Sequence, residues 1–259
     1  MAAPFESIDC VIIDIIFVSS ANDVELFKIT KQAIYTCNKS LTHLNKDVPF
    51  YLPDYTVVES GDLAIKIFNE KYNIKVIPNY DTIFNYNKAL NKGIEKSKSD
   101  YIAFCNNDLI FEKGWLENLI NAMEQTGSES GSPFTPENKA MLQYKENTIG
   151  WTVREHFNGA CFVLKRSAID KIGGKFNECV EGWFSDNVVA QQLINAGVQN
   201  VLCPSSIVHH LGSKTIETLS KEDQENFMNK QIEKLDIYIP SIHDNNPHAK
   251  YWLEKNQKK

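Results

Sequence analysis

The triplet Asn106-Asn107-Asp108 has the clearest chemical potential, because it directly follows the apolar segment Tyr101–Cys105. A short, nearly continuous apolar run predicts a buried strand. In open α/β sheets ligands bind at the carboxyl ends of strands. An acidic side chain there can hold a divalent cation, which in turn neutralises a diphosphate. The same triplet is also typical of an Asx turn that joins a strand to a helix.

A second candidate is Asp186, which follows Trp183, Phe184 and Ser185 at the expected start of a helix. A carboxylate at a helix N-terminus is stabilised by the helix dipole, so one interpretation of Asp186 is a cap. The other is a general base, because a carboxylate above a substrate hydroxyl can accept its proton.

Polar residues also follow two other predicted strands. His209 and His210 end one strand, and only one of them can face a given site because neighbouring residues on a strand point to opposite faces. Imidazole is a common metal ligand, although a structural role is the more frequent one. Lys214, in the next loop, could contact phosphate or solvent. Glu59 closes another strand, where it could accept from a nucleobase N–H or form a turn.

Alternating strands and helices would position these residues. The β-branched run 9–18 predicts a strand covered on both faces, and a helix begins near Asn22. Residues 126–150 are rich in Gly, Ser and Pro, which predicts a loop. The alternation predicts a mostly parallel sheet flanked by helices. We expect further strands at 50–59, 75–78, 100–105, 159–164, 201–204 and 207–209, and further helices at 85–97, 114–125, 167–172, 186–196 and from 220.

Composition excludes several classes of protein. The 259 residues carry a net charge of −6, which is not the signature of a generic nucleic-acid binder. The six cysteines form no C-x-x-C pair, so structural zinc and a disulfide framework are disfavoured and a cytoplasmic protein is expected. No signal peptide or transmembrane run is recognisable. P-loop, G-x-G-x-x-G, G-x-S-x-G and H-E-x-x-H motifs are absent from the sequence.

The order of the segments resembles family 2 glycosyltransferases of the GT-A fold, over about residues 12–214. Each motif alone is weak, but their shared order at plausible spacing is specific. The similar segments are SSAN at 19–22, VVESGD at 57–62, the stretch 85–124 around CNND, NGACFVLKRSAIDKIGGKFNE at 158–178, EGWFSDNVVAQQLINAG at 181–197 and VLCPSSIVHHLGSKT at 201–215.

The resemblance implies a metal-dependent, inverting transferase that uses a nucleotide-diphosphate sugar, typically a UDP-sugar. Asp186 would be the general base, and Glu59 would read the base. Asp108 and His209, chosen by register, would bind Mn²⁺ or Mg²⁺. The remaining donor contacts would be Ser19, Asn22, Asn106, Asn107 and Lys214, and the acceptor contacts would be Gly159, Trp183 and Ser185. Three positions depart from the family pattern: Asn106 at the first D-x-D aspartate, Ser185 at the Glu of Glu-Asp, and Leu90 where the family frequently has an Arg.

The resemblance also implies a single GT-A (Rossmann-like) α/β domain at 1–215, with a C-terminal helical extension at 216–259. The nucleotide-binding half would be 1–110 and the acceptor half 111–215. The expected acceptor is a hydroxyl of a saccharide or glycolipid. A hydroxymethylated base in DNA, as for a phage enzyme, is an alternative, and so is a non-catalytic module that binds nucleotide sugars. A nucleotidyltransferase is disfavoured because SSAND is not a Gly-rich basic loop.

Overall fold

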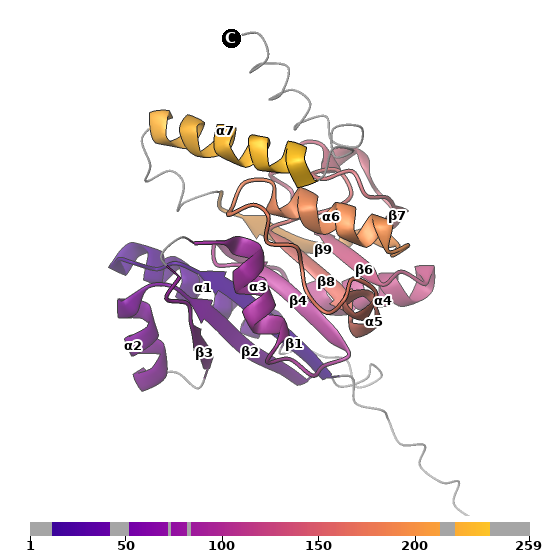
Figure 1. The fold of residues 1–259 in the computed structure, drawn as a ribbon. Coiled ribbons are helices and arrows are strands. Elements are labelled where there is room, and N and C mark those ends of the chain that lie inside the picture. Colours follow the sequence, from indigo (N-terminus) through magenta and orange to yellow (C-terminus); the bar gives the residue numbers. More distant parts are fainter. Residues whose placement is uncertain (1–11, 42–51, 72–73, 82–83, 213–220, 239–259) are drawn as a thin grey trace, which may run out of the picture.

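The computed structural model describes residues 12–41, 52–71, 74–81, 84–212 and 221–238, and strands and helices alternate along most of them (Figure 1). The predicted α/β class is confirmed. The strands are β1 Ile12–Ser19, β2 Leu52–Glu59, β3 Lys75–Pro78, β4 Tyr101–Asn106, β5 Leu109–Phe111, β6 Ser130–Phe134, β7 Thr148–Ile149, β8 Cys161–Lys165 and β9 Asn200–His210. The helices are α1 Val24–Ser40, α2 Asp62–Lys71, α3 Tyr86–Ile94, α4 Trp115–Thr126, α5 Arg166–Lys171, α6 Ser185–Asn195 and α7 Lys221–Tyr238, with a 3-10 turn at Met141–Gln143.

The described strands form one nine-stranded sheet in the order β3-β2-β1-β4-β8-β6-β9-β5, with β7 paired to β9. Strands β3, β2, β1 and β4 are parallel, because α1, α2 and α3 supply the crossovers that parallel neighbours need. Beyond β4 the sheet is mixed: β8 is antiparallel to both β4 and β6, whereas β6 and β9 are parallel. The candidate residues of the triplet follow β4, where the parallel part of the sheet ends.

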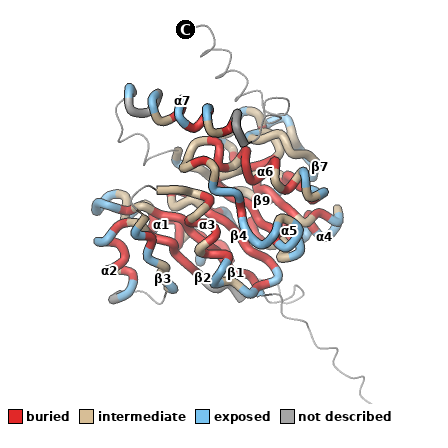
Figure 2. The backbone as a smooth tube through the Cα atoms, viewed as in Figure 1, coloured by how far each residue is buried: buried red, intermediate tan, exposed pale blue. Residues whose placement is uncertain are grey.

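Strand β1 is buried on both faces, as its β-branched sequence predicts, and it divides the core into two layers. Figure 2 shows the central strands largely in red, the colour of buried residues. Ile13, Ile15 and Phe17 pack with α1, α2 and α4, whereas Ile16 and Val18 pack with α3, α5 and α6. The alternation follows from the two-residue period of a strand. The result is a sheet covered by helices on both sides.

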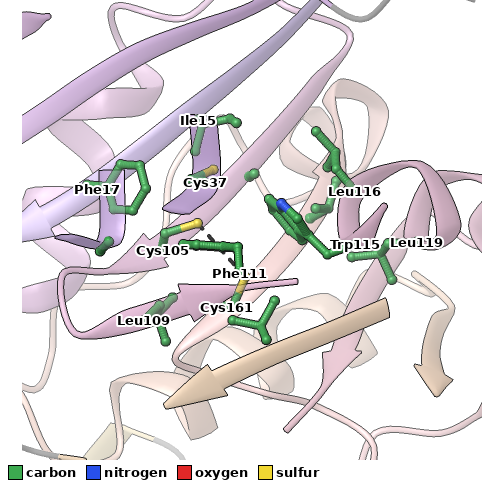
Figure 3. Close-up of a cluster of buried hydrophobic side chains, with 14 of the residues drawn as sticks. Ile15, Phe17, Cys37, Cys105, Leu109, Phe111, Trp115, Leu116, Leu119 and Cys161 are labelled. Carbon is green, nitrogen blue, oxygen red and sulfur yellow. Dashed lines mark hydrogen bonds between the residues drawn. The ribbon is translucent and has the colours of Figure 1, made fainter. Parts of the chain in front are cut away.

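The first of these layers is centred on large aromatic side chains (Figure 3). The ring centroids of Phe111 and Phe17 lie 6.1 Å apart and those of Phe111 and Trp115 lie 4.8 Å apart. In the same layer, the Sγ atoms of Cys105 and Cys161 face each other across β4 and β8 at 3.8 Å. These contacts anchor the end of β4 directly before the Asn106-Asn107-Asp108 triplet.

Two expectations about the second half of the chain are wrong. The predicted loop at 126–150 contains β6, which pairs with β8 and β9 inside the sheet. Its hydroxyl groups are buried, and Ser130 and Ser132 both donate to Asn200 Oδ1. The strands expected at 201–204 and 207–209 are one strand, β9, whose register shifts beside Pro133 and Phe134.

Candidate functional site

A cleft of about 800 Å³ lies at the carboxyl ends of β1 and β4 and at the N-terminus of α6. It brings together residues that are far apart in the sequence. The predicted site residues that line it are Ser19, Asn106, Asn107, Asp108, Gly159, Trp183, Ser185 and Asp186. Asn22, Glu59 and His209 are not among its lining residues, and Lys214 lies outside the described residues.

Tyr86 and Thr30 fix the first two side chains of the triplet. The Tyr86 hydroxyl donates to Asn106 Oδ1 at 2.7 Å, and burial raises the pKa of Tyr86 well above its ordinary value, so this hydroxyl keeps its proton. Asn107 Nδ2 donates to Thr30 Oγ1 at 2.9 Å and to Ser19 Oγ at 3.3 Å. With its carbonyl oxygen engaged, Asn106 presents its amide nitrogen, which suits an oxygen atom of a ligand better than a cation.

Asp108 is the buried member of the triplet, and it lies beside His210. Its Oδ1 atom is 3.2 Å from His210 Nε2, yet neither of these buried atoms has a hydrogen-bond partner among the described residues. A carboxylate oxygen and an imidazole nitrogen that lie this close without a hydrogen bond are suitable donors to a divalent cation. The described residues contain no group of three or more His, Cys, Asp or Glu side chains arranged for a metal. The residues present therefore fit a two-ligand site that a substrate oxygen would complete.

The choice of His209 by register requires correction, because that side chain points elsewhere. Strand β5 pairs with β9 so that Leu109 lies opposite His210, and this places His210 beside Asp108. The ring of His209 instead bridges Glu137, at 2.7 Å from Nδ1, and Glu112, at 2.8 Å from Nε2. Hydrogen bonds to these two carboxylates raise the pKa of His209. Its bridge fastens the loop that carries Glu137, a cleft residue, to the sheet.

Asp186 sits in the first turn of α6, and its surroundings favour a base that holds protons more tightly than usual. Burial raises its pKa, and the positive charge of Arg154 partly offsets that rise. Gly159 touches it so closely that an added Cβ would lie 2.3 Å from Asp186 Cβ. The predicted acceptor contact Gly159 is thus, in the first place, the residue that leaves room for Asp186.

The residues before Asp186 are packed tightly and carry unused polar groups. Phe184 adopts a left-handed conformation at φ 66°, which is unusual for a bulky residue. Ser185 is buried, and neither its Oγ nor Trp183 Nε1 has a hydrogen-bond partner among the described residues. Both residues line the cleft.

Glu59 performs a structural task at the end of β2. Its side chain is fully buried, and Oε1 accepts from the backbone N–H groups of Ala21 at 2.8 Å and Gly61 at 2.7 Å. Glu59 Oε2 has no partner among the described residues. Asn22 lies in the loop that Glu59 holds, and it is exposed, with Nδ2 donating weakly to Ser20 Oγ. The base-reading role of Glu59 remains a prediction.

Several cleft residues gave no readable signal in the sequence. Arg154 lies in an irregular loop with a positive φ, and only the fold brings it near Asp186. Tyr86 lies on the apolar face of a predicted helix, and that pattern does not indicate that its hydroxyl reaches the cleft. The others are Phe84, Thr135, Glu137, Lys139, Phe157, Asn158 and Phe227.

Similarity to known proteins extends over sequence and fold. The family model described as "Glycosyl transferase family 2" matches residues 53–173. Among solved structures, S. aureus TarS 1-349 has a TM-score of 0.58 at 11% identity, over 86% of this chain and 65% of that chain. The chain is therefore family 2-like, with the GT-A fold. The structure of TarS 1-349 in complex with UDP-GlcNAc has a TM-score of 0.56 at 11% identity, over 86% of this chain and 66% of that one.

GalNAc-T7 with UDP, GalNAc and Mn²⁺ has a TM-score of 0.60 at 13% identity, over 91% of this family 2-like chain and 50% of that chain. The chain thus spans between half and about two thirds of the length of these solved structures. The comparison with curated protein sequences finds no match. Within the described residues, no helix has the length and apolar character needed to cross a membrane.

Proposed function

We propose that this chain is a glycosyltransferase that moves a sugar from a nucleotide-diphosphate sugar to an acceptor hydroxyl. The observation that carries the proposal is one cleft that holds Asp108 beside His210 and also holds the buried carboxylate Asp186. The family match and the fold agree with it. TarS 1-349, which has a similar fold, forms a complex with UDP-GlcNAc, and this supports a UDP-sugar as the donor here.

In the proposed reaction the donor lies at the ends of β1 and β4. Ser19 and Asn107 form a hydrogen-bonded floor there, and Asn106 offers its amide N–H groups to donor oxygens. Asp108 and His210 would hold a divalent cation, Mn²⁺ or Mg²⁺, and the cation would offset charge on the leaving diphosphate. The similar structure of GalNAc-T7 contains Mn²⁺ together with UDP, which supports this choice of metal class.

Asp186 would accept the proton of the acceptor hydroxyl. A positioned general base of this kind is worth roughly 10² to 10⁴-fold in rate. Its raised pKa makes the ionised carboxylate a stronger base than an ordinary aspartate. One base next to one donor site matches a single displacement with inversion at the sugar carbon. The neighbouring unpaired groups, Ser185 Oγ and Trp183 Nε1, would orient an acceptor rich in hydroxyl groups.

The proposed acceptor class is a saccharide or glycolipid, because the acceptor side of the cleft combines aromatic rings with these unpaired polar groups. Trp183, Phe157 and Phe227 supply the rings. The assay also includes hydroxymethylated DNA as a second acceptor, because the sequence leaves this acceptor as an alternative. Turnover with DNA and not with sugars would replace the proposed acceptor class.

The experiment is a screen of nucleotide sugars with Mn²⁺, read as released nucleotide diphosphate and as product stereochemistry. We expect Asp186→Asn to abolish transfer and to keep donor binding. Asp170→Asn is the matched control, because Asp170 is an exposed carboxylate on α5. Retained turnover in Asp186→Asn would refute the base assignment. Donor binding without any turnover in the unmodified chain would instead favour a non-catalytic binding module.

A further inference from the structure

Helix α7 packs against the segment that leads into Asp186, although it follows that segment by some forty residues in the sequence (Figure 1). The segment Val180–Phe184 crosses from the α3 side of the molecule to the first turn of α6. Its residues make polar and apolar contacts with one face of α7. These contacts place α7 beside the residues that precede Asp186.

The polar contacts centre on Glu181. Its backbone N–H donates to Gln231 Oε1 at 2.7 Å, and its carboxylate accepts from Gln231 Nε2 and from Lys234 Nζ. Gln231 is fully buried, whereas Glu181 and Lys234 keep part of their side chains exposed. Hydrogen bonds to charged groups are stronger than bonds between neutral groups. Removing one partner leaves the other polar group unpaired, which lowers stability.

The apolar contacts centre on Phe184. Its ring is buried in a cluster that α7 completes, and its backbone is the left-handed residue immediately before Ser185. A bulky residue in this conformation is strained, so it persists only where its surroundings determine it. The other members of the cluster are Val180, Val188, Met228, Ile232 and Leu235, with Cys179 and Trp183 packed against it.

The opposite side of the segment is held by α3. Tyr86 N donates to Glu181 O at 2.7 Å, and Asn87 Nδ2 donates to Asn177 O at 2.8 Å. On the α7 side, the Phe227 ring approaches Gly182 so that an added Cβ would lie 3.5 Å from it, and both residues line the cleft. The segment is therefore held between two helices, and only one of them comes from the N-terminal half.

We propose that α7 is a positioning element of the active site: it clamps Val180–Phe184 through Glu181 and Phe184, and thereby places Asp186. This deepens the proposed function and rests on it for the role of Asp186. In this arrangement residues of the C-terminal helix act through the segment, and Phe227 adds a wall to the acceptor side of the cleft.

The groups that face Asp186 decide what a loosened clamp would do to it. Arg154 supplies a positive charge from the 150–157 loop, and Tyr86 supplies a neutral hydroxyl from α3. Gly159 packs against the side chain, and α7 contributes no charged residue to the cleft among its described side chains. Loosening the segment admits water to the carboxylate, and this moves its pKa back toward the ordinary range.

The test reverses the charge of the clamp. Lys234→Glu places a carboxylate against Glu181, and the double variant Glu181→Lys with Lys234→Glu restores an ion pair of opposite direction. We expect the single variant to lower kcat by about tenfold to a hundredfold, because small displacements of catalytic groups have effects of this size. We expect KM for the donor to stay within about twofold and the acid limb of the pH profile to move to lower pH. The double variant should recover most of kcat.

The control is Glu233→Lys, since Glu233 is exposed on the same helix and the charge changes by the same magnitude with the opposite sign. It should leave kcat unchanged. Hydrogen exchange of the peptide 180–190 gives a readout that needs no activity: exchange should be faster in Lys234→Glu and should return to the original rate in the double variant. If the unmodified chain shows no transfer, the proposed function fails, but this exchange test still decides whether α7 holds the segment.

Wild-type kcat and unchanged exchange in Lys234→Glu would overturn the proposal. So would parallel loss of donor binding, kcat and folding, with no recovery in the double variant, because that pattern indicates general destabilisation.

Discussion

Asp186 is the proposed general base, and burial and the positive charge of Arg154 act on its pKa in opposite directions. Burial disfavours its charged form, and Arg154 favours it. A general base must be ionised to accept a proton, so the rate falls as pH drops through its pKa. The acid limb of the pH profile for kcat/KM should therefore lie above the range of an ordinary carboxylate.

Arg154→Gln tests this balance directly. Removing the positive charge raises the pKa of Asp186 further, so the acid limb should move to higher pH, while the rate on the plateau changes less. Glutamine at the positive φ of position 154 is no more strained than arginine is. Lys139→Gln removes another cleft cation that does not act on Asp186, and it should leave the acid limb in place. A limb that shifts to lower pH in Arg154→Gln would contradict the assignment of Asp186.

At the scale of elements, the site depends on how closely the turn before β8 approaches the first turn of α6. Gly159→Ala would place a methyl group 2.3 Å from Asp186 Cβ, and the two segments must separate. We expect a loss in kcat of about a hundredfold, since a shift near 1 Å has that effect. The expected loss of stability is roughly 1–3 kcal/mol, typical of overpacking. Activity assays and thermal unfolding measure the two effects.

Gly93→Ala is the control for that prediction. Its added Cβ would lie 2.7 Å from the Ile16 side chain, in the core between α3 and β1, so it overpacks the molecule away from Asp186. We expect lower stability with kcat retained below the unfolding temperature. Equal losses of kcat in both variants would mean that Gly159 matters for folding alone.

The elements also show what the sequence could predict. β1 and β4 were recognisable because their apolar side chains are buried on both faces. β6 was not, because the sequence SGSPF has no strand pattern, and its buried hydroxyls bond to residues far along the chain, Asn158 and Asn200. The order of the motifs placed Asp108 and Asp186 at one edge of a sheet, and the cleft lies there.

The choice between the two histidines could not be made locally. It depends on the register between β5, a strand of three residues, and β9. A shift of one residue exchanges the faces of a strand, so His209 and His210 exchange roles with it. The same holds for Arg154 and Phe227, which reach the cleft from an irregular loop and from the last described helix. Such residues are placed by tertiary packing, and no local pattern marks them.

At the scale of the whole molecule, the charge of the cleft matters more than the net charge of −6. Among the described lining residues, the carboxylates Asp108, Glu137 and Asp186 outnumber the cations Lys139 and Arg154. A diphosphate that enters this cleft meets a negative field unless a cation comes with it. Donor binding and metal binding should therefore be coupled, with each favouring the other.

Thermal unfolding measures this coupling, because a ligand that binds only the folded state raises its stability. UDP with Mn²⁺ should raise the Tm by more than the sum of their separate effects, and EDTA should remove the excess. At about a hundred times Kd the gain is about 2.7 kcal/mol, or roughly 5–10 °C for a domain of this size.

Asp108→Asn should abolish the excess and keep the small effect of UDP alone, because it removes one of the two protein ligands. Asp170→Asn should behave as the unmodified chain does. If UDP alone produced the full shift and EDTA had no effect, Asp108 and His210 would be an internal ion pair, and the donor would bind through the Asn106 and Asn107 amides without a metal.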